Sequence, residues 1–343
     1  DYKHKFIRLG SHNATSPRYQ SNLIDEKMSG ITTRREILQM IHDTKIYVST
    51  VSSIFSKPEL MKVKKFETVI IDEASQILEP MLCGLLSHFK RFILIGDHKQ
   101  LPAVVVQDSK RSTINHPLLH EKGFINTRTS FFERLYHQCV RNGWTHAYSI
   151  LDGQGRMHET LMSFPNQYFY ENQLKTLDML PRQRAPYFFN KIDEKTPWIQ
   201  QRMVFISTPM DDSINWKTNI YEADKCIETL QHIIAQYKLN NMELHDQSIG
   251  IITPYRAQIA LIKKRLEQVM PEMMSIITVD TVERYQGGSR DIIIVSFCVN
   301  RLSQLDNLIS LSQEGVDRKL NVTLTRAKEQ IILIGHEAML SKN

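Results

Sequence analysis

The sequence has no apolar run long enough to cross a lipid bilayer. Its longest apolar stretches, such as residues 292–295 and 331–334, are far shorter than the roughly 18 residues that a membrane-spanning helix needs. The first ten residues, DYKHKFIRLG, contain neither an apolar core nor a small-residue cleavage site, so they do not resemble a secretory signal. We therefore expect a protein without membrane association, located in the cytoplasm or the nucleus.

A strong excess of one charge and paired cysteines are also missing. Forty-three Lys and Arg residues face 37 Asp and Glu residues, a net charge of +6 that permits a nucleic-acid partner without requiring one. No two of the four cysteines form a CxxC pair, which argues against a disulfide framework and a zinc knuckle. We expect all four to be buried thiols: Cys83, Cys139, Cys226 and Cys298.

Short β-branched runs alternate with amphipathic stretches along the 343 residues. Strands buried on both faces have this unbroken apolar pattern, so the runs indicate an α/β fold with mainly parallel sheets. Apolar positions three or four apart predict a helix over 219–238, and the capping box from Ser130 to Glu133 predicts another that ends near Val140. The expected strands cover residues 69–72, 92–97, 204–207, 249–253, 292–297 and 331–335.

The length is typical of two domains. A helix break at Asn142 and Gly143 is followed by an independent series of strands and helices, so we place one domain at 1–142 and the other at 143–343. Residues 106–128 and 172–202 are polar, contain proline and are weakly periodic, which predicts long surface connections.

Two motifs in the first half indicate nucleotide chemistry. In VIIDEAS, residues 69–75, an apolar run delivers Asp72 and Glu73 at the end of a strand, where open α/β sheets bind ligands. Asp72 could hold Mg²⁺, and Glu73 could orient or deprotonate an attacking water. In FILIGDHKQLPAVV, residues 92–105, Gln100 could bridge a terminal phosphate and that water. The alternative is that these polar groups are solvated or cap the following turns.

Six ordered motifs resemble those of superfamily 1 helicases of the Upf1-like group. Besides the two above they are GQGRMHE (153–159), TPYRAQ (253–258), VDTVERYQGGSRD (279–291) and LNVTLTRAK (320–328). The resemblance extends from about Phe6 to the last expected strand. It implies two RecA-like domains of the P-loop NTPase type that close over ATP and Mg²⁺, with Asp72 as the metal ligand and Glu73 as the catalytic base.

The resemblance also assigns roles in the second domain. Arg156 and Arg326 match positions whose guanidinium groups reach the phosphates, together with Gln100 and Gly287 as nucleotide-binding residues. Gln286 and Gly287 belong to the motif that links nucleotide to nucleic acid. The sequence departs from the family pattern at Ser289, where many relatives have Glu, and at Gly155, which is commonly Tyr.

Single-stranded DNA or RNA is the expected partner. The candidate contacts are hydroxyl, aromatic and basic side chains that suit sequence-independent binding of phosphates and bases. The alternative is that the hydroxyls cap the helices that follow them. These candidates are Thr50, Ser52, Ser53, Thr253, Tyr255, Arg256 and Gln286.

The phosphate-binding loop GxxxxGK[ST] does not occur in these 343 residues. In the resembling family this loop lies upstream of the motifs found here. The sequence therefore predicts the carboxyl-terminal portion of a longer helicase, with an incomplete first domain and weak ATPase activity on its own. Two hypotheses follow: an ATP-driven translocase, for which the resemblance implies movement 5′ to 3′, or a nucleic-acid-binding or scaffolding module that no longer hydrolyses ATP.

Overall fold

Parallel pairing of short strands organises both compact units of the chain in the computed structural model. The structure describes residues 5–211, 215–312 and 314–342. Contacts divide the chain into a first unit of residues 1–97 and 102–145 and a second unit of residues 98–101 and 146–343. Among the described residues, no helix combines the length and the apolar character needed to cross a membrane. The domain boundary expected after residue 142 stays a prediction.

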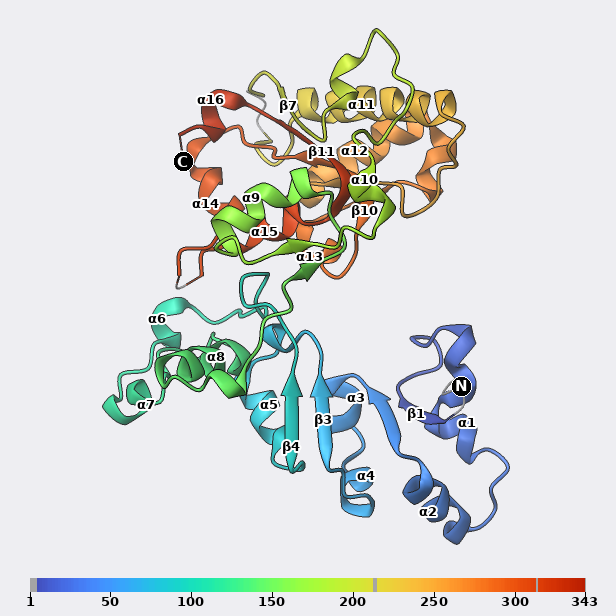
Figure 1. The fold of residues 1–343 in the computed structure, drawn as a ribbon, viewed down its shortest axis with the longest axis vertical. Coiled ribbons are helices and arrows are strands. Elements are labelled where there is room, and N and C mark those ends of the chain that lie inside the picture. The colour runs from blue at the N-terminus through green and yellow to red at the C-terminus, as the bar shows by residue number, and fades with distance from the viewer. Residues whose placement is uncertain (1–4, 212–214, 313, 343) are drawn as a thin grey trace. The chain divides into compact units, whose positions relative to one another are not determined.

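The first unit contains two separate two-stranded sheets (Figure 1). Strand β1 (Phe6–Leu9) pairs in parallel with β2 (Ile46–Ser49), and β3 (Thr68–Ile71) pairs in parallel with β4 (Arg91–Leu94). The helices of this unit are α1 (Ile24–Met28), α2 (Arg34–Asp43), α3 (Val51–Phe55), α4 (Pro58–Val63), α5 (Glu79–Leu86), α6 (Ser109–Ser112), α7 (Pro117–Glu121) and α8 (Phe131–Arg141).

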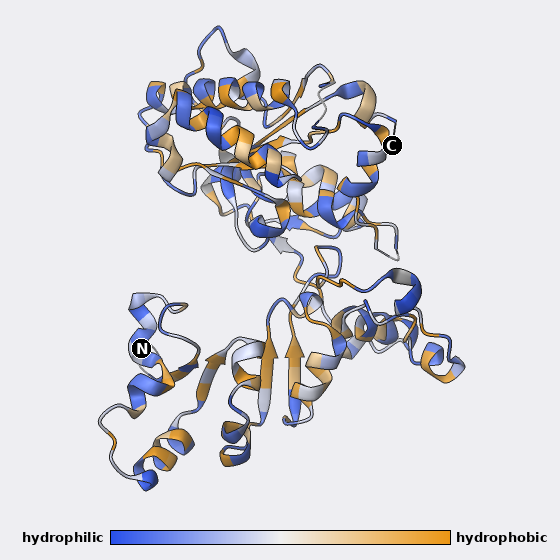
Figure 2. Ribbon diagram, turned by 180° about the vertical axis from the view of Figure 1, so that it is seen from behind, coloured by the Kyte–Doolittle hydropathy of each residue, from blue (hydrophilic) through white to orange (hydrophobic). Residues whose placement is uncertain are grey.

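Strands β3 and β4 are hydrophobic (Figure 2), but their side chains are largely exposed. Ile70 is 64% exposed, Phe92 44% and Ile93 51%. The prediction that both faces of these strands are buried is therefore wrong. The reason is that β4 pairs only with β3 in the described part of the chain, and the apolar cluster around Ile71 and Leu82 covers one side.

The second unit is built on a five-stranded parallel sheet in the order β7-β11-β10-β8-β9. Its central strands are largely buried, because successive side chains of β10 enter two different apolar cores: Ile292 and Ile294 enter one, and Ile293 enters the other. The edge strand β7 is half exposed. The prediction that both faces of a strand are buried therefore holds only for the inner strands of this sheet. The strands are β7 (Met203–Ser207), β8 (Ile249–Ile252), β9 (Thr278–Asp280), β10 (Arg290–Ser296) and β11 (Ala327–Gly335).

Helices cover this sheet, with α11 (Ile220–Leu239) and α12 (Arg256–Val269) packed together and supplying residues to one core. The other core receives residues of α9 (Glu159–Phe169), α13 (Val282–Tyr285) and α15 (Arg318–Leu324). A two-stranded parallel pair, β5 (Gly153–Gln154) and β6 (Lys175–Thr176), lies outside the main sheet. The remaining short helices are α10 (Pro181–Arg184), α14 (Leu305–Leu308) and α16 (Glu337–Leu340).

The two helices expected from sequence are confirmed, since α11 begins after the cap Asn219 and α8 after Ser130, whose hydroxyl accepts the Glu133 N–H at 3.2 Å. Two expectations need correction. Phe189 and Ile199 lie in the segment expected at the surface, yet they are buried in the core beside α11. Cys83 is exposed, whereas the other three cysteines are buried as expected.

Candidate active site

Two carboxylates follow β3 directly at its carboxyl end. Asp72 Oδ1 accepts the backbone N–H of Glu73 at 3.0 Å, and Glu73 Oε2 accepts the side-chain amide of Gln76 at 2.6 Å. Glu73 has a left-handed backbone, with φ of 53° and ψ of 35°, which few residues other than glycine adopt. Backbone strain of this kind gathers at functional sites. The turn leaves both acids exposed at the strand end.

Gly96 allows the loop after β4 to lie against the carboxylate turn. The Ala74 N–H donates to the Ile95 carbonyl at 2.9 Å. A Cβ on Gly96 would stand 3.0 Å from the Ser75 backbone nitrogen and 3.3 Å from that of Ala74, which is closer than ordinary packing permits. The glycine of the GDHKQLP motif is thus required by the close approach of two backbones.

The four residues after Asp97 belong to the second unit. Arg318 Nε donates to the carbonyl of His98 at 2.8 Å, and Asn321 Nδ2 donates to the carbonyl of Lys99 at 2.8 Å. Leu101 is buried in the core that also holds Ile293. These contacts orient Gln100 toward the residues that follow α15.

Arg326 is buried, with 1% of its surface exposed. Its guanidinium donates to the carbonyls of Val322 at 3.0 Å and Gly288 at 3.2 Å, and Nη2 lies 3.4 Å from Gln100 Oε1. A guanidinium keeps its charge when buried and carries five N–H donors in a plane. The Arg326 guanidinium therefore contacts both Gln100 and the glycine-rich loop at Gly288.

Arg156 reaches the same region. Its Nη1 donates to the carbonyl of Thr325 at 3.3 Å, while Nη2 of Arg326 donates to the hydroxyl of Thr325 at 3.0 Å. Two cationic side chains from distant motifs thus both contact Thr325, and their roles toward a phosphate stay predictions. An anion bound here would be stabilised by both charges.

The structure explains one departure from the family pattern. A Cβ on Gly155 would lie 3.2 Å from Leu177 Cδ1 and 3.4 Å from Leu180 Cδ1. The space beside this position is therefore filled by two leucine side chains in place of the aromatic ring that is common there. Nothing in the structure explains Ser289.

Gln286 and Gly287 form a sharp turn after α13. Gly287 has a φ of 78°, and no atom lies within 4 Å of where its Cβ would be, so the position is open. The side-chain nitrogen of Gln286 is buried without a hydrogen-bond partner among the described residues. The positive φ is a backbone conformation that favours glycine, and the roles of Gln286 and Gly287 in binding stay predictions.

The hydroxyl groups near residue 50 cap a helix. Thr50 Oγ1 accepts the backbone N–H of Ser53 at 3.1 Å and donates to the Ser53 hydroxyl at 2.8 Å, at the start of α3. Ser52 is exposed and Ser53 is partly buried within the first turn. The capping alternative is thus correct for Thr50, and contact with nucleic acid stays a prediction for all three residues.

Thr253, Tyr255 and Arg256 lie where β8 leads into α12. Thr253 is fully buried, whereas Arg256 is exposed. The Tyr255 hydroxyl accepts a hydrogen bond from Gln304 Nε2 at 3.3 Å, and burial raises the pKa of this phenol. The phenol is therefore neutral at ordinary pH and presents its ring beside the strand ends.

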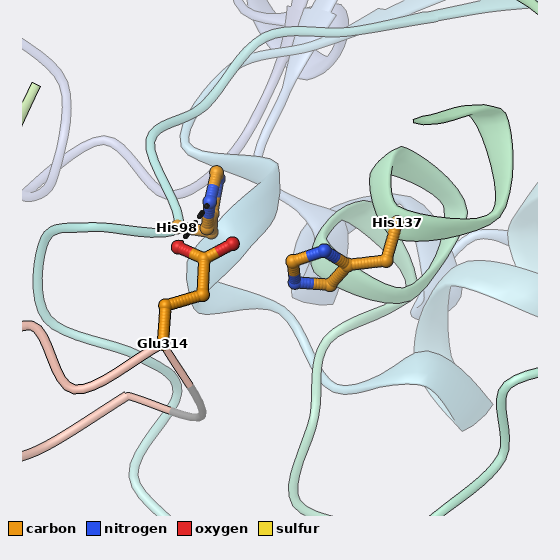
Figure 3. A group of neighbouring side chains, drawn as sticks. All are labelled: His98, His137 and Glu314. Atoms are coloured by element: carbon orange, nitrogen blue, oxygen red, sulfur yellow. Dashed lines mark ion pairs between the residues drawn. The ribbon is translucent and has the colours of Figure 1, made fainter. Parts of the chain in front are cut away.

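The pairing of His98 with Glu314 was not predicted from the sequence. His98 Nε2 lies 3.4 Å from Glu314 Oε2, as the dashed line in Figure 3 marks. Both residues belong to the second unit. No motif predicts a role for Glu314, because its loop has neither periodicity nor a recognisable pattern. The pair adds a further contact between residues 98–101 and the loop before α15.

Two known protein families match most of the chain. An AAA domain family matches residues 127–338, and a second AAA domain family matches residues 3–108. An uncharacterized ATP-dependent helicase of Methanocaldococcus jannaschii is 28% identical over 320 residues. The DNA replication ATP-dependent helicase/nuclease DNA2 of Gallus gallus is 28% identical over 336 residues, and the DNA polymerase alpha-associated DNA helicase A of Saccharomyces cerevisiae is 26% identical over 329.

These relatives are longer proteins. The matches cover 91%, 97% and 90% of this chain but only 42%, 29% and 44% of the respective relatives. The family matches agree with the order of the six motifs, and the parallel α/β sheets agree with the expected fold class. The chain belongs to the AAA domain family and, within it, to the superfamily 1 helicases of the Upf1-like group.

Proposed function

We propose that the whole protein hydrolyses ATP with Mg²⁺ to move 5′ to 3′ along single-stranded DNA or RNA. The observation that carries this proposal is that Arg156 and Arg326 both donate to Thr325, while Arg326 also donates to Gln100. Two guanidinium groups and an amide from three separate motifs are the donors that phosphoryl transfer requires. Family membership supports the same activity.

The first unit contributes the acidic residues. Asp72 suits magnesium, because it is an exposed carboxylate at a strand end and Mg²⁺ in nucleotide sites takes one or two carboxylates beside phosphate oxygens. Glu73 would accept a proton from the attacking water. Bound Mg²⁺ would supply neutralisation of phosphate charge, which the acids alone cannot provide.

The second unit contributes the cations. Arg326 is held by two carbonyl groups, so its position is fixed before any phosphate arrives. Fixed charges need little reorganisation when negative charge develops during the reaction, which is why they accelerate it. Arg156 has a less buried side chain and would complete the neutralisation.

We further propose that the whole protein supplies a phosphate-binding loop outside these 343 residues. The exposed apolar side chains of β3 and β4 support this, because strands of this composition are normally covered on both faces. Sequencing the coding region upstream of Asp1 tests the proposal. A GxxxxGK[ST] loop supports the helicase, and its absence supports an ATPase-inactive binding module.

Steady-state ATP hydrolysis by the full-length protein, with and without single-stranded nucleic acid, tests the enzyme assignment. Glu73→Gln should lower the stimulated rate by roughly 100- to 10,000-fold, because general-base catalysis contributes about that much. Glu59→Gln, at an exposed position of α4 in the same unit, is the matched control and should keep the rate. A retained rate in the Glu73 variant would remove the proposed base.

Strand polarity and sugar preference need a separate measurement. Duplexes with a 5′ or a 3′ single-stranded tail, made in DNA and in RNA, are offered to the full-length protein with ATP. We expect unwinding only from 5′ tails. DNA is the substrate to test first, since two of the relatives are named for DNA replication and DNA polymerase alpha.

A further inference from the structure

A cavity of 600 Å³ opens at the carboxyl ends of the main sheet in the second unit. Its walls include Thr253 after β8, Phe297 after β10 and residues of α14. Ligands of open α/β sheets bind at this end of the strands, and the volume is in the usual range for small-molecule sites. The cavity is therefore large enough for a nucleotide.

Two aromatic rings stand in its wall. The rings of Trp216 and Tyr255 are 5.9 Å apart at 80°, an edge-to-face pair. The buried amide of Gln304 fixes both residues, because its Nε2 donates to the Trp216 carbonyl at 2.9 Å and to the Tyr255 hydroxyl at 3.3 Å. A preset aromatic pair offers a stacking platform with little ordering on binding.

The Thr253 hydroxyl provides a polar group for a ligand. Thr253 is 0% exposed and lines the cavity, and its Oγ1 has no hydrogen-bond partner among the described residues. A buried hydroxyl left unpaired is unfavourable, so it normally meets a partner of its own protein, water or a ligand. The polar edge of a nucleobase would satisfy it.

Two lysines, Lys217 and Lys319, and two acids, Glu283 and Asp317, stand in the wall. Lys217 Nζ lies 4.9 Å from the centre of the Trp216 ring, and its side chain is exposed. Lys319 Nζ donates to the Asn307 carbonyl at 2.9 Å and is 4.0 Å from Glu283. Of the two, Lys217 is the better placed for a phosphate, since the charge of Lys319 is partly balanced.

We propose that this cavity receives one unstacked base of single-stranded nucleic acid. The base stacks on the Trp216–Tyr255 pair, its polar edge bonds the Thr253 hydroxyl, and the adjoining phosphate lies near Lys217. This inference rests on the proposed function and names a subsite for its substrate. Every base has a flat aromatic face, so such a site is tolerant of sequence, as a translocating protein requires.

The affinity of the 343-residue chain for a short fluorescein-labelled oligothymidylate, measured by anisotropy at low salt, tests the platform. Trp216→Ala should weaken binding roughly 5- to 150-fold, the range measured for loss of one stacking ring. Trp144→Ala, at an exposed position of the first unit, is the matched control and should bind like the parent. Thr253→Val preserves shape and should weaken binding roughly 2- to 10-fold.

Tryptophan emission provides a second readout that does not depend on the folding of the alanine variant. With Trp144→Phe and Trp198→Phe in place, Trp216 is the single tryptophan of the chain. Oligothymidylate should quench it, and an abasic oligomer with the same number of phosphates should not. Quenching by free thymidine monophosphate at the same concentration would assign the cavity to free nucleotide and overturn the strand proposal.

The failure of this inference differs from failure of the proposed function. Tight oligonucleotide binding with unquenched Trp216 and equal affinities of the two tryptophan-to-alanine variants overturns the cavity proposal and leaves the helicase assignment standing. Absence of any binding by the 343-residue chain at low salt also overturns the cavity proposal, whereas the helicase assignment fails only if the full-length protein shows no ATP hydrolysis stimulated by single strands.

Discussion

The sheet of β3 and β4 and the sheet around β10 arise from the same sequence signal but have different environments. Ile93 in β4 is 51% exposed, whereas Ile293 in β10 is 0% exposed. Strand β10 has a strand on each side, and its two faces enter two cores. Strand β4 has one neighbour among the described residues.

The difference shows that an apolar run specifies a strand and not its burial. Burial depends on how many strands and helices lie beside it, and those partners come from distant parts of the sequence. The exposed apolar strands carry the acidic motif, and the buried strands support the arginine motifs. Substitutions in the two units are therefore predicted to differ in their effects on stability and on ATP hydrolysis.

The largest expected contrast compares one substitution in the two sheets. Ile293→Ala should lower the free energy of unfolding of the second unit by roughly 2–5 kcal/mol, because it removes buried methyl groups and leaves a cavity. Ile93→Ala should change that of the first unit by less than about 1 kcal/mol. Urea unfolding followed by Trp198 and Trp216 for one unit, and by Trp144 for the other, measures both. Equal losses would contradict the comparison.

The next contrast lies within the first unit. Gly96→Ala should destabilise it by about 1–3 kcal/mol, because the new Cβ would meet the Ser75 nitrogen at 3.0 Å. Gly84→Ala is the matched control. Its Cβ would meet only the Phe55 ring at 3.7 Å, so in helix α5 it should stabilise by roughly 0.5–1 kcal/mol. Urea unfolding followed by Trp144 gives both values, and the same sign for both would refute the close-approach argument.

The last contrast concerns a buried acid of the second unit. Burial raises the pKa of Glu222 from 4.5 to about 7, although its carboxylate accepts the Ser296 hydroxyl and the Cys298 N–H. The folded state therefore binds an extra proton between these values, and stability falls as the pH rises from about 4.5 to about 7. Above that range the contribution of this group is constant.

Glu222→Gln imitates the protonated acid and should remove this pH dependence. Melting temperatures should be measured for both proteins between about pH 5 and 8. The melting temperature of the variant should rise relative to that of the parent by roughly a few degrees as the pH increases. Glu267→Gln, at an exposed position of α12 in the same unit, should leave the profile of the parent unchanged. A constant difference across this pH range would argue against a titrating Glu222.

Local signals in the sequence predicted much of the fold. The caps at Ser130 and Asn219, and the strands after which Asp72 and Thr253 lie, follow from patterns within a few residues. The burial of Phe189 and the exposure of Cys83 did not follow, because each depends on contacts with remote segments. Such contacts leave no periodic trace in a single sequence.

The candidate site, like the fold, could be predicted only in part from the sequence. Motif order predicted roles for Arg156, Arg326 and Gln100, and the structure adds that both arginines donate to Thr325 and that Arg326 donates to Gln100. Sequence reasoning gave no role to Trp216, since its segment has no motif and a lone tryptophan is ordinary. Its place beside Tyr255 depends on Gln304, which lies 49 residues after that tyrosine.

The central claim is that ATP hydrolysis needs the arginines of the second unit as well as the acids of the first. Single-strand-stimulated ATP turnover by the full-length Arg156→Ala variant tests it most directly, since Arg156 is only partly buried and its loss should leave the fold intact. We predict a turnover number lower by roughly 1,000-fold or more, the usual effect of an arginine finger, with Arg141→Ala as the matched control that keeps its rate. An Arg156 variant that turns over ATP as fast as this control would contradict the account.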